Sequence, residues 1–255
     1  MQNIFDYPAF LFILSFVVMW LAARIGASVL RRFRSIEEDA RDDFGVIEAA
    51  TLTLLALIIG FTFSMAVARY DQRKNYEEEE ANAIGTEYVR ADLLPAADAA
   101  TVRGLLKTYL DERVLFYTTR DDDELARVNA ETERLQAAMW SSIKNVAAAQ
   151  PTPVTALAVS GMNDVLNTQG YTQAAWWNRI PAAAWALMVV IAVCANLLVG
   201  YGARGLKAGA GLLLIVPLVV SLAFGLIADI DSPRGGEIRV KPQNLHALVD
   251  SIRPR

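Results

Sequence analysis

Four long apolar segments constrain this chain more than any other feature of its sequence. They cover residues 9–30, 46–68, 182–201 and 208–230. Each segment has the roughly 20 residues that a helix needs to cross the hydrocarbon core of a bilayer. Apolar residues make up 54% of the chain, above the roughly 45–50% of an average soluble domain, and the excess lies in these segments. We therefore predict an all-α integral membrane protein with four transmembrane helices.

The residues that flank or interrupt these segments refine the assignment. No basic residue precedes the first segment, whereas Arg31, Arg32 and Arg34 follow it. This is the reverse of a secretory signal peptide, so we interpret the first segment as a retained span. Pro217 lies inside the fourth segment and is expected to kink that helix, which neighbouring helices can tolerate in a membrane.

Between the second and third segments the chain becomes polar, and its apolar residues recur at helical spacing. The first helix of this region is predicted to continue the second span to Leu94, where Pro95 ends it. Three more helices are predicted: one from about Asp98, one after the acidic residues 121–123, and one that stops at Gly170. The predicted domains are residues 1–69 (spans 1 and 2), 70–180 (a polar helical domain), 181–230 (spans 3 and 4) and 231–255 (a polar tail).

The sequence offers little for catalysis, metal binding or nucleic-acid binding. The net charge of −4 gives no reason to expect a nucleic-acid partner. Cys194 is the single cysteine, so no disulfide or cysteine metal site can form within one chain. His246 is the single histidine, has no ligand-forming neighbours at suitable spacing, and is expected on the surface. We therefore predict no enzyme activity, cofactor or metal site.

Three groups of charged residues each have a structural and a functional interpretation. The four glutamates from Glu77 to Glu80 form either a solvated helix face or a cation site, and the solvated face is the simpler choice. Glu48 either complements the helix dipole in the first turn of span 2 or lines a water path inside the membrane. Arg69 and Arg73, one turn apart where span 2 leaves the bilayer, either extend to the headgroups or surround the mouth of a pore.

The end of the second span resembles that of the bestrophin family. Residues 60–73 contain a Gly-Phe pair, an arginine eight residues after the phenylalanine, and then an aromatic residue, Tyr70. The order of elements is also similar, with two spans, a helical domain, two spans and a tail. The strongest resemblance is to the bestrophin-like group of bacterial membrane proteins of unassigned function, for which residues 80–85 and 90–95 look typical.

A second resemblance follows the fourth span. Bestrophins carry an acidic residue there and then a Pro-Phe-Gly-acidic signature, which is similar to Asp231, Pro233, Gly235 and Glu237. Arg234 stands where bestrophins have phenylalanine. The dense acidic run that completes a calcium clasp in animal members is missing, so the resemblance does not imply calcium gating.

The resemblance implies a pore. Bestrophins assemble as pentamers whose second span lines the pore, which places Thr53, Leu57 and Phe61 on its axis; their i, i+4, i+8 spacing puts them on one helical face. Rings of Leu and Phe are suited to a hydrophobic constriction, and an arginine ring at the mouth favours anions. Glu48, Arg69 and Arg73 are the expected mouth residues. We thus expect a homo-oligomeric channel for small inorganic anions, surrounded by membrane lipid.

Two alternatives stay open at this point. A membrane-anchored sensor or scaffold, whose helical domain binds a ligand or partner, would have the same span pattern. The orientation is also contested: the arginines of residues 31–43, with Arg204 and Lys207, place the short loops in the cytoplasm by the positive-inside rule. Bestrophin topology instead places the helical domain there. We follow the family arrangement and expect a bacterial inner-membrane protein.

Overall fold

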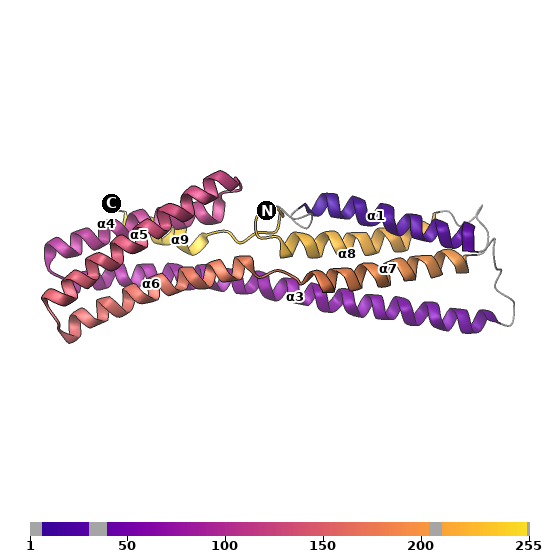
Figure 1. Cartoon of the computed structure of the whole chain (residues 1–255), viewed down its shortest axis with the longest axis horizontal. Helices are drawn as coiled ribbons and strands as arrows, with labels where there is room; N and C mark the ends of the chain where they lie inside the picture. Colours follow the sequence, from indigo (N-terminus) through magenta and orange to yellow (C-terminus); the bar gives the residue numbers. More distant parts are fainter. Residues whose placement is uncertain (1–6, 31–39, 204–210, 254–255) are drawn as a thin grey trace. The chain divides into compact units, whose positions relative to one another are not determined.

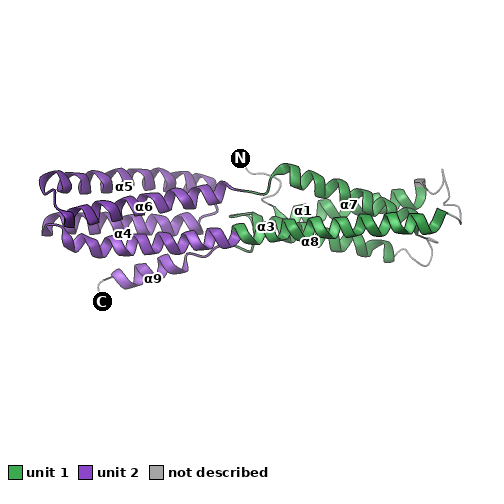
Figure 2. Cartoon of the chain, turned by 90° about the horizontal axis from the view of Figure 1, so that it is seen from below, with its two compact units in different colours: residues 1–69, 179–239 green, residues 70–178, 240–255 purple. Residues whose placement is uncertain are grey.

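The chain divides into two compact units, each built from segments that are distant in sequence. The computed structural model describes residues 7–30, 40–203 and 211–253, and nearly all of these are helical, with no strand among them. Unit 1 contains residues 1–69 and 179–239, and unit 2 contains residues 70–178 and 240–255 (Figure 2). The four-part domain division stays a prediction. The structure adds that residues 240–255 belong to the same compact unit as residues 70–178.

Unit 1 is made of the apolar helices (Figure 1). They are α1 (Pro8–Ile25, continued by a π-helical turn Gly26–Leu30), the first part of α3 (Arg41–Arg90), α7 (Ala182–Gly202) and α8 (Ile215–Asp231, preceded by a 3₁₀ turn Leu212–Leu214). Within the described residues, four helical segments are long and apolar enough to cross a membrane. The prediction of an all-α membrane protein with four spans is confirmed.

Small residues allow α1 and α7 to pack backbone against backbone. A Cβ atom on Gly200 would overlap the carbonyl oxygen of Ala23, and one on Gly26 would overlap that of Leu197. Close approach through glycine is a common way for membrane helices to associate, because lipid provides no hydrophobic drive between them. These two glycines therefore set the distance between α1 and α7.

The kink expected at Pro217 stays a prediction, and the structure shows where in span 4 this proline lies. The α-helical part of span 4 begins only at Ile215, so Pro217 lies in its first turn rather than in its interior. The first backbone N–H groups of a helix have no partner within it, and a proline there costs no hydrogen bond. Arg31, Arg32, Arg34, Arg204 and Lys207, on which the orientation argument rests, lie outside the described residues, as does the predicted start of span 4 at residue 208.

Unit 2 is a helical bundle with a continuous apolar core. Its helices are the second part of α3, α4 (Ala96–Thr118), α5 (Asp122–Ala149), α6 (Pro153–Trp177) and α9 (Gln243–Ile252). As expected, the long helix from span 2 ends just before Pro95, through a 3₁₀ turn Ala91–Leu93. The side chain of Asp121 accepts a hydrogen bond from the Glu124 amide at 2.8 Å and caps α5.

The predicted stop at Gly170 is wrong, because α6 continues to Trp177. A glycine inside a helix costs only about 1 kcal/mol relative to alanine. The residues after it compensate for this cost, since Thr172 and Trp176 are buried in unit 2. The Trp176 ring lies 4.9 Å from the Phe116 ring, centroid to centroid.

The four consecutive glutamates do not form one solvated face. Glu78 and Glu79 are exposed, whereas Glu77 and Glu80 are buried and bonded within unit 2. Glu77 accepts the backbone N–H groups of Asn244 (2.9 Å) and Leu245 (3.0 Å), and so caps the N-terminus of α9. The stretch predicted as a polar tail thus contains an amphipathic helix that unit 2 holds.

Glu80 forms a buried ion pair with Arg113 of α4. Its second carboxylate oxygen also accepts hydrogen bonds from the hydroxyl groups of Tyr117 (3.2 Å) and Thr172 (3.3 Å). Burial acts to lower the Arg113 pKa, but the attraction to Glu80 outweighs it and the pKa is raised. Burial also raises the pKa of Tyr117, so its hydroxyl stays a donor to Glu80. Three helices, α3, α4 and α6, are joined at this one carboxylate.

Candidate functional site

The three predicted pore-lining residues lie together on an exposed stripe of α3 in unit 1. Thr53 is exposed, Leu57 is 52% exposed and Phe61 is 64% exposed. With about 100° between successive helical residues, they fall within a quarter turn of one another. Within the described part of the chain, this face of span 2 is therefore left exposed.

The stripe is longer than the three predicted residues. At the same angular position on the helix lie further exposed small or hydroxyl residues: Ala50, Gly60, Ser64 and Ala68. Ser64 follows Thr53 by 11 residues, which is close to three full helical turns. This spacing in the sequence could have identified Ser64 as a further pore-lining candidate. The stripe thus combines two bulky apolar side chains with hydroxyl and small residues.

Span 2 is the least covered of the four spans. Of the 18 consecutive residues that form its most apolar stretch, only 6% are buried, against 28% to 44% in the corresponding stretches of the other three spans. Its buried side is narrow and is marked by Leu55, Thr62 and Ala66. The hydroxyl groups of Thr53 and Thr62 each bond a carbonyl oxygen four residues earlier, at 2.8 Å, so neither carries an unpaired donor at membrane depth.

Glu48 does not share the stripe with the three pore-lining candidates. It lies on the opposite side of α3, where its Oε2 atom is 3.2 Å from the position that a Cβ on Gly202 of α7 would take. Phe44 lies against the same glycine, and its ring is 5.5 Å from that of Tyr201. Within one chain, Glu48 is therefore placed at the contact between α3 and α7.

The two candidate arginines of the pore mouth differ from each other. Arg69 is half-buried, about a third of a turn from the stripe, and its Nη2 atom lies 3.7 Å from the Met65 sulfur. Arg73 belongs to unit 2 and is only 2% exposed. Because it is buried in its own chain, Arg73 is poorly placed to face permeating ions, and Arg69 is the remaining cation of the predicted mouth.

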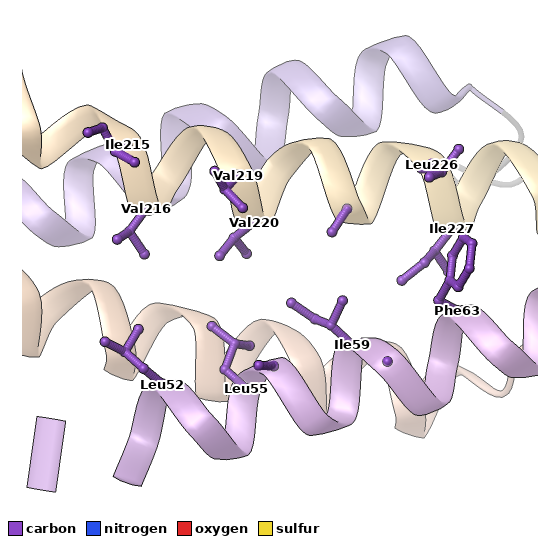
Figure 3. A pocket seen from close by; sticks show the side chains of 13 residues that line it. Leu52, Leu55, Ile59, Phe63, Ile215, Val216, Val219, Val220, Leu226 and Ile227 are labelled. Carbon is purple, nitrogen blue, oxygen red and sulfur yellow. The ribbon is translucent and has the colours of Figure 1, made fainter. Parts of the chain in front are cut away.

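An apolar groove lies between α3 and α8, on a different side of α3 from the stripe (Figure 3). It has a volume of about 630 Å³ and only apolar side chains and glycine line it, among them Leu52, Ile59 and Phe63 of α3. In Figure 3 the side chains of Val216, Val220 and Ile227 of α8 point toward α3 across this groove. Gly60 is the one residue that the groove shares with the stripe, so Phe61 and Phe63 belong to different surfaces of one helix.

The motif after α8 forms a tightly bonded turn in unit 1. Asp231 is 1% exposed and pairs with Arg179, whose Nε atom lies 3.1 Å from the carboxylate. The backbone N–H of Ile180 also donates to Asp231, at 3.2 Å. Asp231 thus ties the end of α8 to the segment that leads into α7. Sequence reasoning included Asp231 but missed Arg179, which lies 52 residues away in the chain.

The rest of this turn depends on Asp229, which sequence reasoning also missed as a site residue. Its two carboxylate oxygens accept the backbone N–H groups of Glu237 and Ile238, both at 2.8 Å. Gly235 donates its N–H to the Ser232 hydroxyl at 3.1 Å. Pro233 is half-buried, whereas Gly235 and Glu237 are exposed.

Donors of the protein itself therefore occupy the carboxylates of Asp229 and Asp231. Asp229 accepts two backbone N–H groups, and Asp231 accepts a guanidinium and a backbone N–H. A cation would have to displace these donors in order to bind. In the part of the chain that the structure describes, no group of three or more His, Cys, Asp or Glu side chains could hold a metal ion.

A family profile described as the Bestrophin-like domain matches residues 9–245. The chain belongs to the Bestrophin-like family. No curated protein sequence matches it. Solved structures of a bacterial bestrophin homolog from Klebsiella pneumoniae are similar in fold, and at this low identity the likeness concerns the fold alone. One is 16% identical with a TM-score of 0.60 and covers 96% of this chain and 95% of its own. A single-substitution variant is 15% identical with a TM-score of 0.61 and covers 94% and 93%.

Family membership and fold confirm the resemblance that the motifs of span 2 and of the turn after span 4 predicted. They also establish this Bestrophin-like chain as an integral membrane protein. The roles of Thr53, Leu57, Phe61, Glu48 and Arg69 stay predictions. A pore on the stripe requires other copies of the chain, because the described residues of a single copy leave the stripe exposed.

Proposed function

We propose that this Bestrophin-like chain forms a homo-oligomeric ion channel in which the exposed stripe of α3 faces the pore. The observation that carries the proposal is the exposure of Thr53, Leu57 and Phe61 on the least covered span of the molecule. Copies arranged around an axis, five of them by resemblance to bestrophins, would turn this face inward. By the same resemblance, we place unit 2 in the cytoplasm and the channel in the inner membrane.

The stripe has the chemistry of a gated pore. Rings of Leu57 and Phe61 would narrow the path with apolar side chains, which close by excluding water. Thr53 and Ser64 would offer hydroxyl oxygen atoms on either side of that constriction. Small inorganic ions are therefore the proposed substrate, and membrane lipid would contact the surfaces of unit 1 that face away from the axis.

Replacing Phe61 by alanine should raise the single-channel conductance of the reconstituted protein, because it removes the widest apolar side chain from the proposed constriction. Phe63→Ala is the matched control. It makes the same chemical change two residues later, on the groove side of the helix, and should leave conductance unchanged. Recordings from planar bilayers with each variant measure the difference.

Two results would contradict the channel. Equal conductance in the Phe61 and Phe63 variants would remove Phe61 from the constriction. Purified particles that are monomers or dimers without an axial channel would reject the pore itself and leave the membrane-anchored sensor or scaffold as the better explanation.

The proposed preference for small anions now depends on Arg69, since Arg73 is buried. Replacing Arg69 by glutamine should move the reversal potential in a potassium chloride gradient away from the chloride equilibrium potential. Lys144→Gln, which removes an exposed cation from α5, controls for the change in net charge and should have no effect. A wild-type channel that already prefers potassium would reject the anion preference while keeping the channel.

A further inference from the structure

Glu87 is a buried carboxylate in unit 2 that the proposed channel does not use. It lies on α3, is 0% exposed, and neither of its carboxylate oxygens accepts a hydrogen bond from a described residue. It lies against Gly161 of α6, where a Cβ would overlap the Glu87 carboxylate. An unpaired buried carboxylate is costly in its ionised form, so burial at this position favours the protonated form of Glu87.

Two charged groups act on Glu87. Arg90, one turn later on α3, also lies against Gly161, and Asp164 is on α6. The Nη1 atom of Arg90 lies 4.0 Å from the carboxylate of Asp164, which is itself exposed. Asp92, near the end of α3, pairs instead with Arg103 of α4. Arg90 thus lies between two carboxylates: it pairs with the exposed Asp164, whereas the buried Glu87 carboxylate beside it accepts no hydrogen bond from it.

Burial raises the pKa of Glu87 to about 8; Arg90 opposes this effect, and Asp164 adds to it. At pH 7 the side chain is therefore mostly neutral. The folded state holds the proton more tightly than the unfolded state, whose glutamate has its ordinary pKa near 4.5. Unit 2 therefore loses stability as the pH rises from about 4.5 to about 8.

We propose that the α3–α6 contact at Gly161 is a proton-controlled element with two arrangements. With Glu87 protonated, Arg90 pairs with Asp164 and the helices pack closely. When Glu87 ionises, its buried charge requires a counter-charge, and Arg90 moves from Asp164 to Glu87. There is no free space at Gly161 for this movement, because the side chains of Glu87 and Arg90 already lie against its backbone. The contact with α6 loosens as a result.

Hydrogen exchange of the purified full-length protein between pH 6 and pH 9, corrected for intrinsic rates, tests this element. Protection of the α6 amides around Gly161 should fall as the pH passes about 8. Glu87→Gln keeps the shape of the neutral side chain and should stay protected over the whole range. Asp164→Asn removes the competing partner of Arg90. It also removes a negative charge that opposes the ionisation of Glu87, so the pH at which α6 loses half of its protection should be lower than in the wild type.

Glu131→Gln changes a partly exposed glutamate of α5 that pairs with Arg134; it is the control, and its hydrogen-exchange protection should depend on pH as in the wild type. A wild-type α6 whose protection is constant from pH 6 to pH 9 would overturn the proposal. So would an unchanged transition in Glu87→Gln. The readout is independent of ion conduction, so failure of the channel proposal and failure of this one are distinguishable.

Discussion

Replacing Arg113 by methionine should lower the free energy of unfolding of unit 2 by about 3–5 kcal/mol, as is typical when one partner of a buried ion pair is removed. Arg113 and Glu80 are both 0% exposed. Methionine fills much of the same space but leaves the Glu80 carboxylate with only the hydroxyl groups of Tyr117 and Thr172. It also removes the guanidinium that lies 4.3 Å above the Phe116 ring.

Thermal unfolding followed by tryptophan fluorescence measures this loss, since Trp176 packs beside Phe116 and Tyr117 in the same cluster. Arg134→Met is the matched control, because Arg134 pairs with Glu131 on the exposed surface of α5. The control should unfold like the wild type, since exposed ion pairs contribute little. A double variant, Glu80→Met with Arg113→Met, should recover much of the lost stability. Equal unfolding of the Arg113 and Arg134 variants would contradict the ion-pair argument.

Replacing Gly200 by alanine should destabilise unit 1 by about 3 kcal/mol, near the upper end of the cost of overpacking. The added methyl group would overlap the backbone carbonyl of Ala23. Neither atom belongs to a flexible side chain, so α1 and α7 would have to move apart. The fraction of monodisperse protein that survives heating in detergent measures the effect.

Gly45→Ala is the control for this substitution. It makes the same chemical change in unit 1, at a glycine whose Cβ would meet nothing within 4 Å. Alanine restricts the unfolded chain, so this variant should be neutral or more stable by up to about 1 kcal/mol. Two variants with equal survival would show that the α1–α7 contact is not limiting for unit 1.

Predictions from the sequence succeeded where one local pattern dominates. Apolar length defined the four spans, because the bilayer imposes the same requirement on every segment that crosses it. The acidic residues before α5 marked its start, since an aspartate at that position caps the first turn whatever packs nearby. The i, i+4, i+8 spacing placed Thr53, Leu57 and Phe61 on one face of α3, and the structure leaves all three exposed.

The failures occurred where a residue's role depends on partners far away in the chain. In the sequence, Glu77 and Glu80 belong to a stretch of charged residues that was expected at the surface. In the structure Glu77 caps α9, and Glu80 pairs with Arg113. Gly170 is a residue type that often ends helices, but α6 continues beyond it because Thr172 and Trp176 are buried. Glu87 gave no signal at all, because only its contact with Gly161 makes it unusual.

The sequence by itself determined that this protein spans a membrane four times and carries a helical domain, because hydrophobic length and helical spacing are properties of the local chain. Only the tertiary structure decided which side chains those helices bury. It placed Arg73 inside unit 2, placed Glu48 against α7, and left the Phe61 face of span 2 uncovered. The physical reason is that burial, and with it the cost or use of a charge, depends on neighbours that folding brings together from distant positions.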